Sequence, residues 1–183
     1  EGGHSLGGNL ANVGEFARRG AVYLTIAHFF PNGVASSADF GRVFQDKGLT
    51  PFGREVVREC QRHRVLVDLA HCSERSFREA MDLTEGPVLF SHTGARALQP
   101  IDRNISDEQA RSIARRGGVI GVIFFSAYHR RGLLGRLEDL LDNLCHLVRV
   151  AGAEHVCIGS DMDGWIWAPL DLPDASRLPR LTE

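Results

Sequence analysis

The sequence has 183 residues, of which 43% are hydrophobic, and it carries 21 Lys and Arg against 23 Asp and Glu. This composition is typical of a globular domain, and the near-neutral charge provides no basic surface for nucleic acid. The longest apolar run, residues 118–128, is far shorter than the roughly 18 residues that a membrane span needs. We therefore expect neither a nucleic-acid partner nor a transmembrane segment in this chain.

Amphipathic stretches alternate along the chain with short apolar runs that are rich in β-branched residues. The alternation is typical of repeated βα units, and the continuously apolar runs favour a parallel sheet covered on both faces. In chain order, the predicted elements are a helix at Leu10–Arg19, a strand at Ala21–His28, a helix at Pro51–Arg62, a strand at Val65–His71, a helix at Glu74–Asp82, a strand at Pro87–His92, a helix at Asp107–Arg115, a strand at Gly118–Phe125, a helix at Arg136–Ala151 and a strand at His155–Asp161.

Capping residues mark several of these boundaries. Ser73 and Ser106 are favourable N-caps, and Gln109, three residues after Ser106, completes a capping box. Glycines stand where helices should end, at Gly20, Gly117 and Gly152.

The spacing of the strands predicts an α/β fold of the (β/α)8 TIM-barrel type, with an open doubly wound sheet as the alternative. A barrel of this type takes about 250 residues, and the predicted strands, with one more ending near Glu1, fall short of eight. The barrel is therefore expected to be incomplete, without its first two strands and its C-terminal helices. Asn32–Leu49, rich in small and polar residues, is expected to form a long loop over the barrel mouth.

Both ends of the sequence resemble internal cuts, because the chain starts without Met at Glu1 and stops at Glu183 after a proline-punctuated stretch. We expect residues 1–183 to be a single fragment of a catalytic barrel from a longer protein. A cytoplasmic location is favoured, but a secretion signal or lipid anchor would lie outside this sequence. The four cysteines contain no C-x-x-C pair, and we expect free thiols.

Residues able to bind metal end several predicted strands. His28, His71 and His92 each follow an apolar run, and so does Asp161. In a parallel barrel these strand ends lie at one rim, where active sites are assembled. A single histidine in such a place more often makes a structural hydrogen bond, but histidines and a carboxylate in register form the ligand set that Zn²⁺ prefers. The pattern therefore predicts a metal site. The remaining histidines lack this placement and are expected to have surface or structural roles.

The segment after Asp161 also invites comparison with a calcium loop. An EF-hand beginning at Asp161 would need Gly and Glu where this chain has Ile166 and Leu172. The calcium interpretation is therefore rejected.

Several of these motifs together resemble the membrane (renal) dipeptidase family, the binuclear zinc peptidases of the amidohydrolase superfamily. They occur in the order of that family and span nearly the whole chain. The matching stretches are Glu1–His4, Tyr23–His28, Asp68–Ser73, Pro87–His92, Asp102–Asn104 and Gly159–Gly164.

The resemblance implies a set of metal ligands. Glu1 corresponds to the carboxylate that bridges the pair of zinc ions, and His71 and His92 correspond to the imidazole ligands of one ion. Asp161 corresponds to the aspartate beside the other ion, which also accepts a proton from the bridging water. A complete site would hold both zinc ions.

The resemblance also implies roles toward substrate. His28 resembles the histidine that polarises the scissile carbonyl and stabilises its oxyanion, and Arg103 resembles the arginine that receives the terminal carboxylate. Asp161 and His28 are thus the predicted catalytic residues, and His28 and Arg103 the predicted substrate-binding residues. The implied activity is hydrolysis of small dipeptides by a hydroxide that bridges the metals, with homodimerisation left open.

The sequence departs from the family pattern in two places. The family opens with a His-x-Asp pair that ligates one metal, and no histidine here is followed two residues later by Asp. Because only one half-site is then complete, we expect the fragment alone to be inactive. Phe124-Phe125 stands where some members place a tyrosine near the substrate.

Other functions remain open at this point. The same hydroxide could attack N-acyl amino acids, lactones or β-lactams, which would make the protein a different amidohydrolase. A non-catalytic binding domain that kept the barrel is the alternative outside enzymes. Metal content and substrate profiling would separate these hypotheses.

Overall fold

The computed structural model describes residues 1–183 except 40–42, 131, 133 and 183, and it contains a five-stranded parallel sheet. The strands stand in chain order from β1 to β5. A doubly wound sheet reverses its strand order at a switch point, whereas a barrel adds each strand on the same side of the last. The order therefore confirms the prediction of an incomplete TIM-barrel type.

The chain forms two compact units. The first unit contains residues 1–90 and 116–118, and the second contains residues 91–115 and 119–183. Strand β3, Leu89–Thr93, contributes residues to both.

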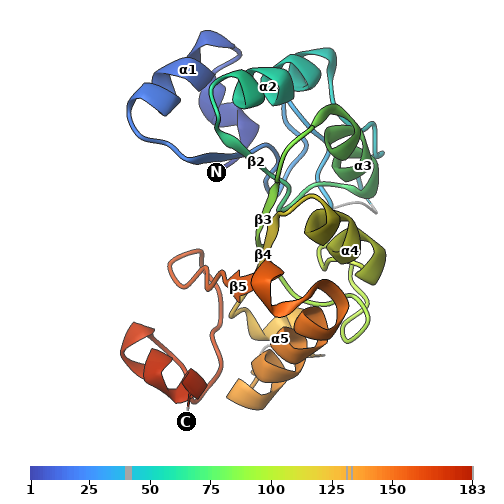
Figure 1. Ribbon diagram of the computed structural model, residues 1–183. Helices are drawn as coiled ribbons and strands as arrows, with labels where there is room; N and C mark the ends of the chain where they lie inside the picture. The colour runs from blue at the N-terminus through green and yellow to red at the C-terminus, as the bar shows by residue number, and fades with distance from the viewer. Residues whose placement is uncertain (40–42, 131, 133, 183) are drawn as a thin grey trace. The chain divides into compact units, whose positions relative to one another are not determined.

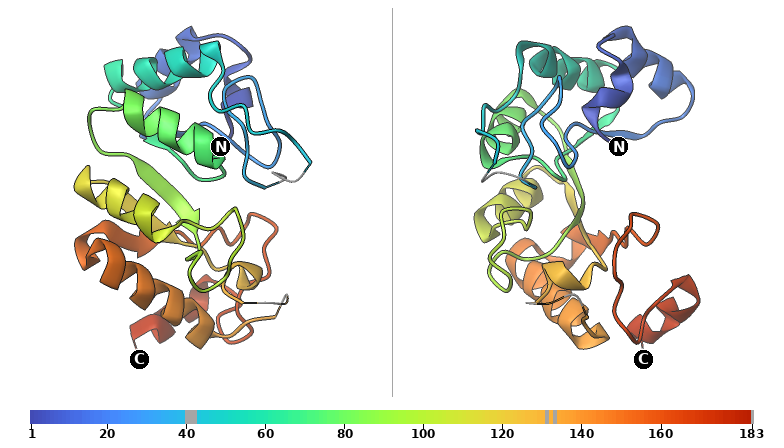
Figure 2. Two further views of the ribbon diagram at one scale, coloured as in Figure 1. Left: turned by 90° about the vertical axis from the view of Figure 1, so that its right-hand side faces the viewer. Right: turned by 180° about the vertical axis from the view of Figure 1, so that it is seen from behind.

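In the first unit, β1 and β2 pair in parallel with Thr25 opposite Asp68. Helices α1 and α2 lie side by side (Figures 1 and 2). Thr50 caps α2, since its Oγ1 accepts a hydrogen bond from Gly53 N at 2.9 Å, and Ser73 caps α3 through Ser76 N at 3.1 Å. The elements of this unit are η1 (Gly3–Leu6), α1 (Ala11–Arg18), β1 (Tyr23–Thr25), α2 (Pro51–Arg62), β2 (Leu66–Asp68) and α3 (Glu74–Leu83).

In the second unit, α4 and α5 lie side by side (Figure 2), and His146 Nε2 of α5 is 2.7 Å from Asp107 Oδ1 of α4. The predicted capping box is present, because Ser106 N donates to Gln109 Oε1 at 2.9 Å and Gln109 N donates to Ser106 Oγ at 3.2 Å. The elements are α4 (Asp107–Arg115), β4 (Val119–Val122), η2 (Ser126–Tyr128), α5 (Leu137–Ala151), η3 (Ala153–His155), β5 (Val156–Ile158) and η4 (Ala175–Thr182).

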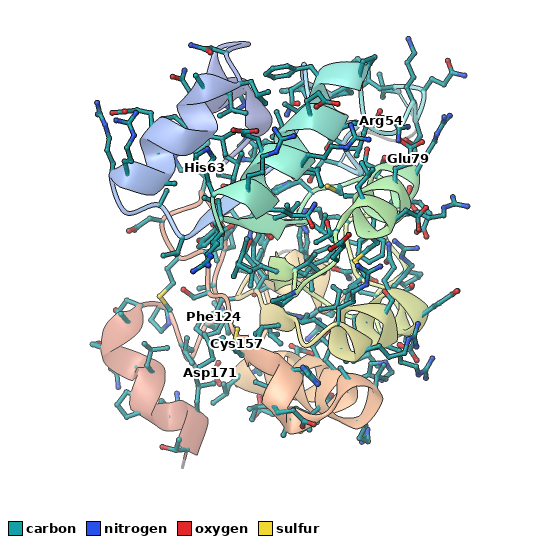
Figure 3. The ribbon with its side chains drawn as sticks, turned by 45° about the horizontal axis from the view of Figure 1, so that its top comes forward. Arg54, His63, Glu79, Phe124, Cys157 and Asp171 are labelled. Carbon is teal, nitrogen blue, oxygen red and sulfur yellow. The ribbon has the colours of Figure 1, made fainter. Side chains whose placement is uncertain are left out.

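Each unit has its own hydrophobic core. In the first, Ile26 and Leu69 are fully buried beside the strand ends. In the second, Ile120 and Phe124 are buried to the same extent, and Phe124 is labelled in Figure 3. No described helix has both the length and the apolar stretch needed to cross a membrane.

The C-terminal ends of three predicted strands were wrong. β1, β2 and β5 each end three residues before His28, His71 and Asp161, respectively. His71 and Asp161 have positive φ angles of 65° and 58°, which an extended ladder cannot contain. After Glu1 the chain leads into η1, and Gly3 N donates to Ile26 O at 3.2 Å; the strand expected to end near Glu1 stays a prediction. The predicted loop at Asn32–Leu49 is present, although residues 40–42 lie outside the described part of the chain.

All four cysteines are free thiols in the structure. Burial raises the pKa of Cys60 to about 12, so this thiol stays protonated near neutral pH. Cys157 is exposed and is labelled in Figure 3.

Glycine is required in the second unit where strands approach most closely. A Cβ atom on Gly121 of β4, or on Gly159 after β5, would lie 1.9 Å from the carbonyl oxygen of Ser91. We predict that Gly121→Ala lowers the free energy of unfolding by about 1–3 kcal/mol, because the backbone must shift to make room for the methyl group.

Urea unfolding of the protein expressed from its complete gene measures this effect. Gly86→Ala is the matched control, because its Cβ would enter open space and its φ angle is ordinary. An unfolding midpoint for Gly121→Ala equal to that of Gly86→Ala would contradict the prediction.

Candidate active site

Three of the predicted site residues come together in the first unit. The carboxylate of Glu1 lies 3.1 Å from His71 Nε2 and 3.6 Å from His28 Nε2. His28 and His71 follow β1 and β2, whose register places Thr25 opposite Asp68, so residues three positions later are also neighbours. Their ring centroids are 4.8 Å apart. The neighbouring parallel strands thus bring both imidazoles to one carboxylate.

Glu1 is placed by the turn that follows it. Gly2 has a φ of 85°, and a Cβ atom there would lie 2.3 Å from the His4 ring and 3.3 Å from His28 Cβ. Only glycine both adopts this positive φ without strain and lacks the Cβ atom for which there is no room. Gly3 N then bonds to the backbone of Ile26, which fixes the start of the chain against the segment that carries His28.

The electrostatics of this cluster favour a neutral His28. Burial lowers the pKa of His28, and the neighbouring His71 ring lowers it further, although Glu1 acts in the opposite direction. His28 is therefore neutral around pH 7, where a neutral imidazole carries a single N–H donor.

Two carboxylates that the sequence analysis missed support these histidines, a half-buried one at Asp39 and a buried one at Asp68. Asp39, in the loop between β1 and α2, lies with its Oδ2 2.7 Å from His71 Nδ1. Asp68, the last residue of β2, accepts hydrogen bonds from Thr25 Oγ1 at 2.6 Å and Ala70 N at 3.1 Å, and so shapes the turn that leads to His71. The sequence could have indicated Asp68, because a carboxylate in an otherwise apolar strand is unusual. Asp39 lies in an irregular loop, where no periodic pattern of apolar residues marks it.

In the second unit, His92 and Arg103 are joined. His92 lies within β3, and its carbonyl oxygen accepts a hydrogen bond from Arg103 Nη1 at 3.1 Å. Its ring Nδ1 is 2.8 Å from Ser91 Oγ. Arg103 is only 4% exposed, and its guanidinium carbon stands 5.6 Å from the centre of the Tyr128 ring, where a cation–π interaction is favourable.

The loop that carries Arg103 is held by the fully buried side chain of Asn104. Its Oδ1 accepts from Gly94 N at 3.0 Å, and its Nδ2 donates to the carbonyls of Gln99 at 2.9 Å and Tyr128 at 2.8 Å. These bonds hold the backbone of the loop next to Arg103.

Asp161 stands on a tight turn after β5. Gly164 N donates to the carbonyl oxygen of Asp161 at 2.9 Å, and a Cβ on Gly164 would lie 2.3 Å from the Asp161 carboxylate. The side chain therefore packs over its own turn. A positive φ at a non-glycine residue, as at Asp161 and His71, costs conformational energy and is concentrated at functional sites.

Two of the histidines outside this group have local structural contacts. His129 is buried, which lowers its pKa, and its Nε2 lies 2.7 Å from Ile123 O. His63 directly follows α2, and its Nε2 lies 3.1 Å from Oε1 of Glu59 in that helix.

The donor atoms around Glu1 suit a zinc ion. Carboxylate oxygen and imidazole nitrogen are zinc ligands with bond lengths of about 2.0–2.2 Å. Donors 3.1 Å apart, as in Glu1 and His71, can therefore reach the same ion. His71 also has a carboxylate behind its second ring nitrogen, which is the usual surrounding of a metal-binding histidine.

Comparison with known proteins identifies the family. The sequence matches the family model of membrane dipeptidase (peptidase family M19) over residues 1–183. An uncharacterized dipeptidase of Schizosaccharomyces pombe is 35% identical over an alignment of 184 positions, which covers 99% of this chain and 44% of that protein.

Solved structures agree with this result. A metallo peptidase from Rhodobacter sphaeroides, liganded with a phosphinate mimic of the dipeptide L-Ala-D-Ala, is 30% identical with a TM-score of 0.91, and the match covers 100% of this chain and 54% of that one. An amidohydrolase from Pseudomonas aeruginosa is 25% identical with a TM-score of 0.89, covering 100% and 62% of the respective chains. The chain thus spans less than two thirds of the length of these relatives. The sequence match over its whole length and the likeness in structure show that the chain belongs to the membrane dipeptidase family.

Proposed function

We propose that the protein is a zinc-dependent dipeptidase that hydrolyses the peptide bond of small dipeptides. One observation carries the proposal: the carboxylate of Glu1 stands between His71 Nε2 and His28 Nε2, at 3.1 and 3.6 Å. Family membership supports it, and the Rhodobacter sphaeroides relative was crystallised with a dipeptide mimic.

The proposed metal ligands are Glu1, His71, His92 and Asp161. Zinc ions, when bound, act as Lewis acids and lower the pKa of a bound water toward neutrality. Glu1 would be one of the residues that hold the metal, because its carboxylate oxygens are zinc ligands. The other ligands would come from strand β3 and from the segments that follow β2 and β5.

Other side chains act on the substrate. Neutral His28 donates a hydrogen bond to the oxygen of the scissile carbonyl, a kind of contact that is worth about 3 kcal/mol as negative charge develops there. Asp161 accepts a proton from the attacking water and passes it to the departing amine. Arg103 orients the terminal carboxylate of the dipeptide.

A broader amidohydrolase activity is the second candidate. The likeness to the Pseudomonas aeruginosa amidohydrolase favours it, because the same residues could serve attack on an N-acyl amino acid, a lactone or a β-lactam. A free carboxylate distinguishes dipeptides from simple lactones, but N-acyl amino acids carry this group as well. Arg103 would contribute wherever the group is present, so N-acyl amino acids are separated from dipeptides by comparing their rates directly.

The test uses the protein expressed from its complete gene, purified under zinc-replete conditions. We expect about two zinc ions per chain, as in other binuclear sites, and hydrolysis of dipeptides such as L-Ala-D-Ala. Dipeptide amides should react about 10–100 times more slowly, because they lose a charge-assisted hydrogen bond worth about 1.5–3 kcal/mol. Absence of zinc would favour a binding domain, and hydrolysis of lactones or N-acyl amino acids alone would favour the second candidate.

A further inference from the structure

We propose that Asp39 is a positioning residue that fixes the tautomer and the orientation of His71, so that His71 Nε2 faces Glu1 as the metal-binding atom. The inference rests on the proposed function, because it assigns Asp39 a part in building the same site. Neither nitrogen of the His71 ring faces open solvent, since the side chain is only 4% exposed.

The two nitrogens of the His71 ring face two different carboxylates. Nδ1 is 2.7 Å from Asp39 Oδ2, and Nε2 is 3.1 Å from Glu1 Oε1. The side chain of Asp39 is 8% exposed, whereas that of Glu1 is 36% exposed. The Asp39 contact is therefore the more protected of the two.

A carboxylate beside Nδ1 selects one form of the ring. A neutral imidazole has one N–H, and an ionised carboxylate can only accept a hydrogen bond. Because the Asp39 contact, at 2.7 Å, is shorter and more protected than the 3.1 Å contact with Glu1, it favours the proton on Nδ1 and leaves the lone pair on Nε2 for a metal. Such carboxylate–histidine pairs also raise the basicity of the ligand and prevent rotation of the ring.

Asp39 is itself held by the chain around it. Ser37 Oγ donates to Asp39 Oδ2 at 3.0 Å, and Asp39 N donates to Ser37 Oγ at 3.2 Å. The backbone of this segment pairs with the residues that contain His71: Ala38 N donates to His71 O at 2.9 Å, and Ser37 forms an antiparallel bridge with Cys72. These contacts tie the segment that carries Asp39 to the backbone of His71.

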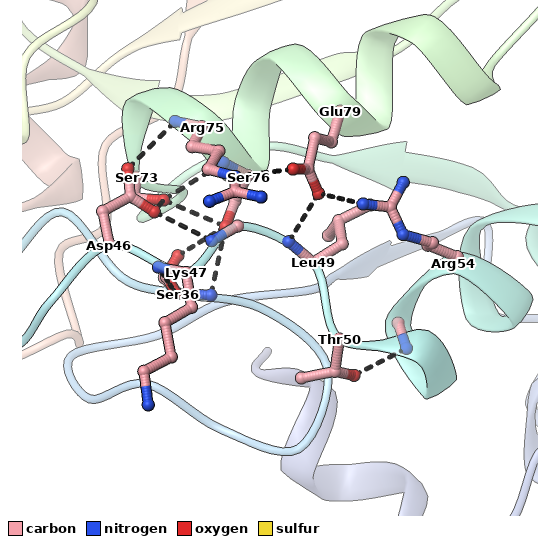
Figure 4. A network of polar contacts seen from close by, with 12 residues as sticks. Ser36, Asp46, Lys47, Leu49, Thr50, Arg54, Ser73, Arg75, Ser76 and Glu79 are labelled. Carbon is pink, nitrogen blue, oxygen red and sulfur yellow. Dashed lines mark hydrogen bonds and ion pairs between the residues drawn. The ribbon is translucent and has the colours of Figure 1, made fainter.

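The far end of the same loop is fastened to α3 (Figure 4). Asp46 accepts hydrogen bonds from Ser73 Oγ at 2.6 Å and Arg75 N at 3.1 Å at the start of that helix. Glu79 accepts from Leu49 N at 3.0 Å, and its carboxylate pairs with Arg54 of α2 at 2.7 Å (Figures 3 and 4). These bonds secure both ends of the loop without contacting the His71 ring.

The experiment compares Asp39→Ala and Asp39→Asn with wild-type protein expressed from its complete gene. Zinc affinity is measured by competition with a chelator. Histidine-selective ¹⁵N NMR of the zinc-loaded protein reports whether His71 carries its proton on Nδ1 and how fast that proton exchanges. Asp46→Asn is the matched control, because it removes a carboxylate from the same loop that bonds to Ser73 and Arg75 instead.

We expect Asp39→Ala to weaken zinc binding by about 10–100-fold, as is usual when the partner of a metal-binding histidine is removed. The slowly exchanging Nδ1 proton of His71 should disappear in this variant, and Asp39→Asn should keep part of the signal because its amide oxygen can still accept. Asp46→Asn should retain wild-type zinc affinity and the His71 signal.

Unchanged zinc affinity and an unchanged His71 signal in Asp39→Ala would overturn the inference. Equal losses in Asp39→Ala and Asp46→Asn would also overturn it, because the loop would then act only as a structural support. Wild-type protein that binds zinc but hydrolyses no dipeptide would contradict the proposed function alone, whereas wild-type protein that binds no zinc would contradict both.

Discussion

Replacing Asp161 with Asn is expected to lower kcat for dipeptide hydrolysis by about 10²–10⁴-fold, the usual contribution of a general acid–base group. Asn has nearly the same shape, so it can remain on the turn that Gly164 closes, but its amide cannot accept and return a proton. Because the proposed role is proton transfer, KM should change little. Steady-state kinetics of the protein expressed from its complete gene measure both quantities.

Asp163→Asn is the matched control for this variant. It lies in the same turn, is exposed, and removes the same charge two residues away. Its kcat should stay near that of the wild type, and the zinc content of both variants should be checked. Near-normal kcat for Asp161→Asn would remove Asp161 from the proposed mechanism.

Replacing Glu1 with Gln is expected to have the second large effect. The change removes the negative charge that lies 3.1 Å from His71 Nε2 and 3.6 Å from His28 Nε2. Zinc content should fall well below that of the wild type. Because metal catalysis supplies several kcal/mol, turnover should fall more than about a hundredfold.

Metal analysis and kinetics at increasing zinc concentration test this prediction. Excess zinc should restore part of the activity, because the remaining ligands are unchanged. Glu55→Gln is the control, since Glu55 is an exposed residue of α2 in the same unit. Among the ion pairs of the described residues, Glu55 forms one with Arg58 of the same helix and no other. Full zinc content and activity in Glu1→Gln would contradict the proposed role.

Helices were the part of the fold that sequence predicted best, because their signals are local. The predicted bounds of α2 and α4 agree with the structure, and the capping box of Ser106 and Gln109 formed as expected. Strand ends were predicted less well. The apolar runs continue through the turns after β1, β2 and β5, so hydrophobicity alone does not mark where the ladder of hydrogen bonds stops.

The candidate site was predictable where residue type and position coincide. His28 and His71 follow neighbouring strands, and the register of those strands is sufficient to make them neighbours. Asp39 could not be found in this way, because it lies 32 residues from His71 in the sequence and its place depends on backbone pairing of an irregular loop. Contacts of this kind are set by tertiary packing, which leaves no periodic signal.

The central claim is that Glu1 and His71, together with His92 and Asp161, hold zinc. The most direct measurement is a crystal structure of the complete, zinc-loaded protein with anomalous diffraction data collected at the zinc absorption edge. We predict anomalous peaks within bonding distance, about 2.0–2.2 Å, of a Glu1 oxygen and of His71 Nε2. Peaks at other residues, or no ordered peak in protein that contains zinc, would contradict the claim.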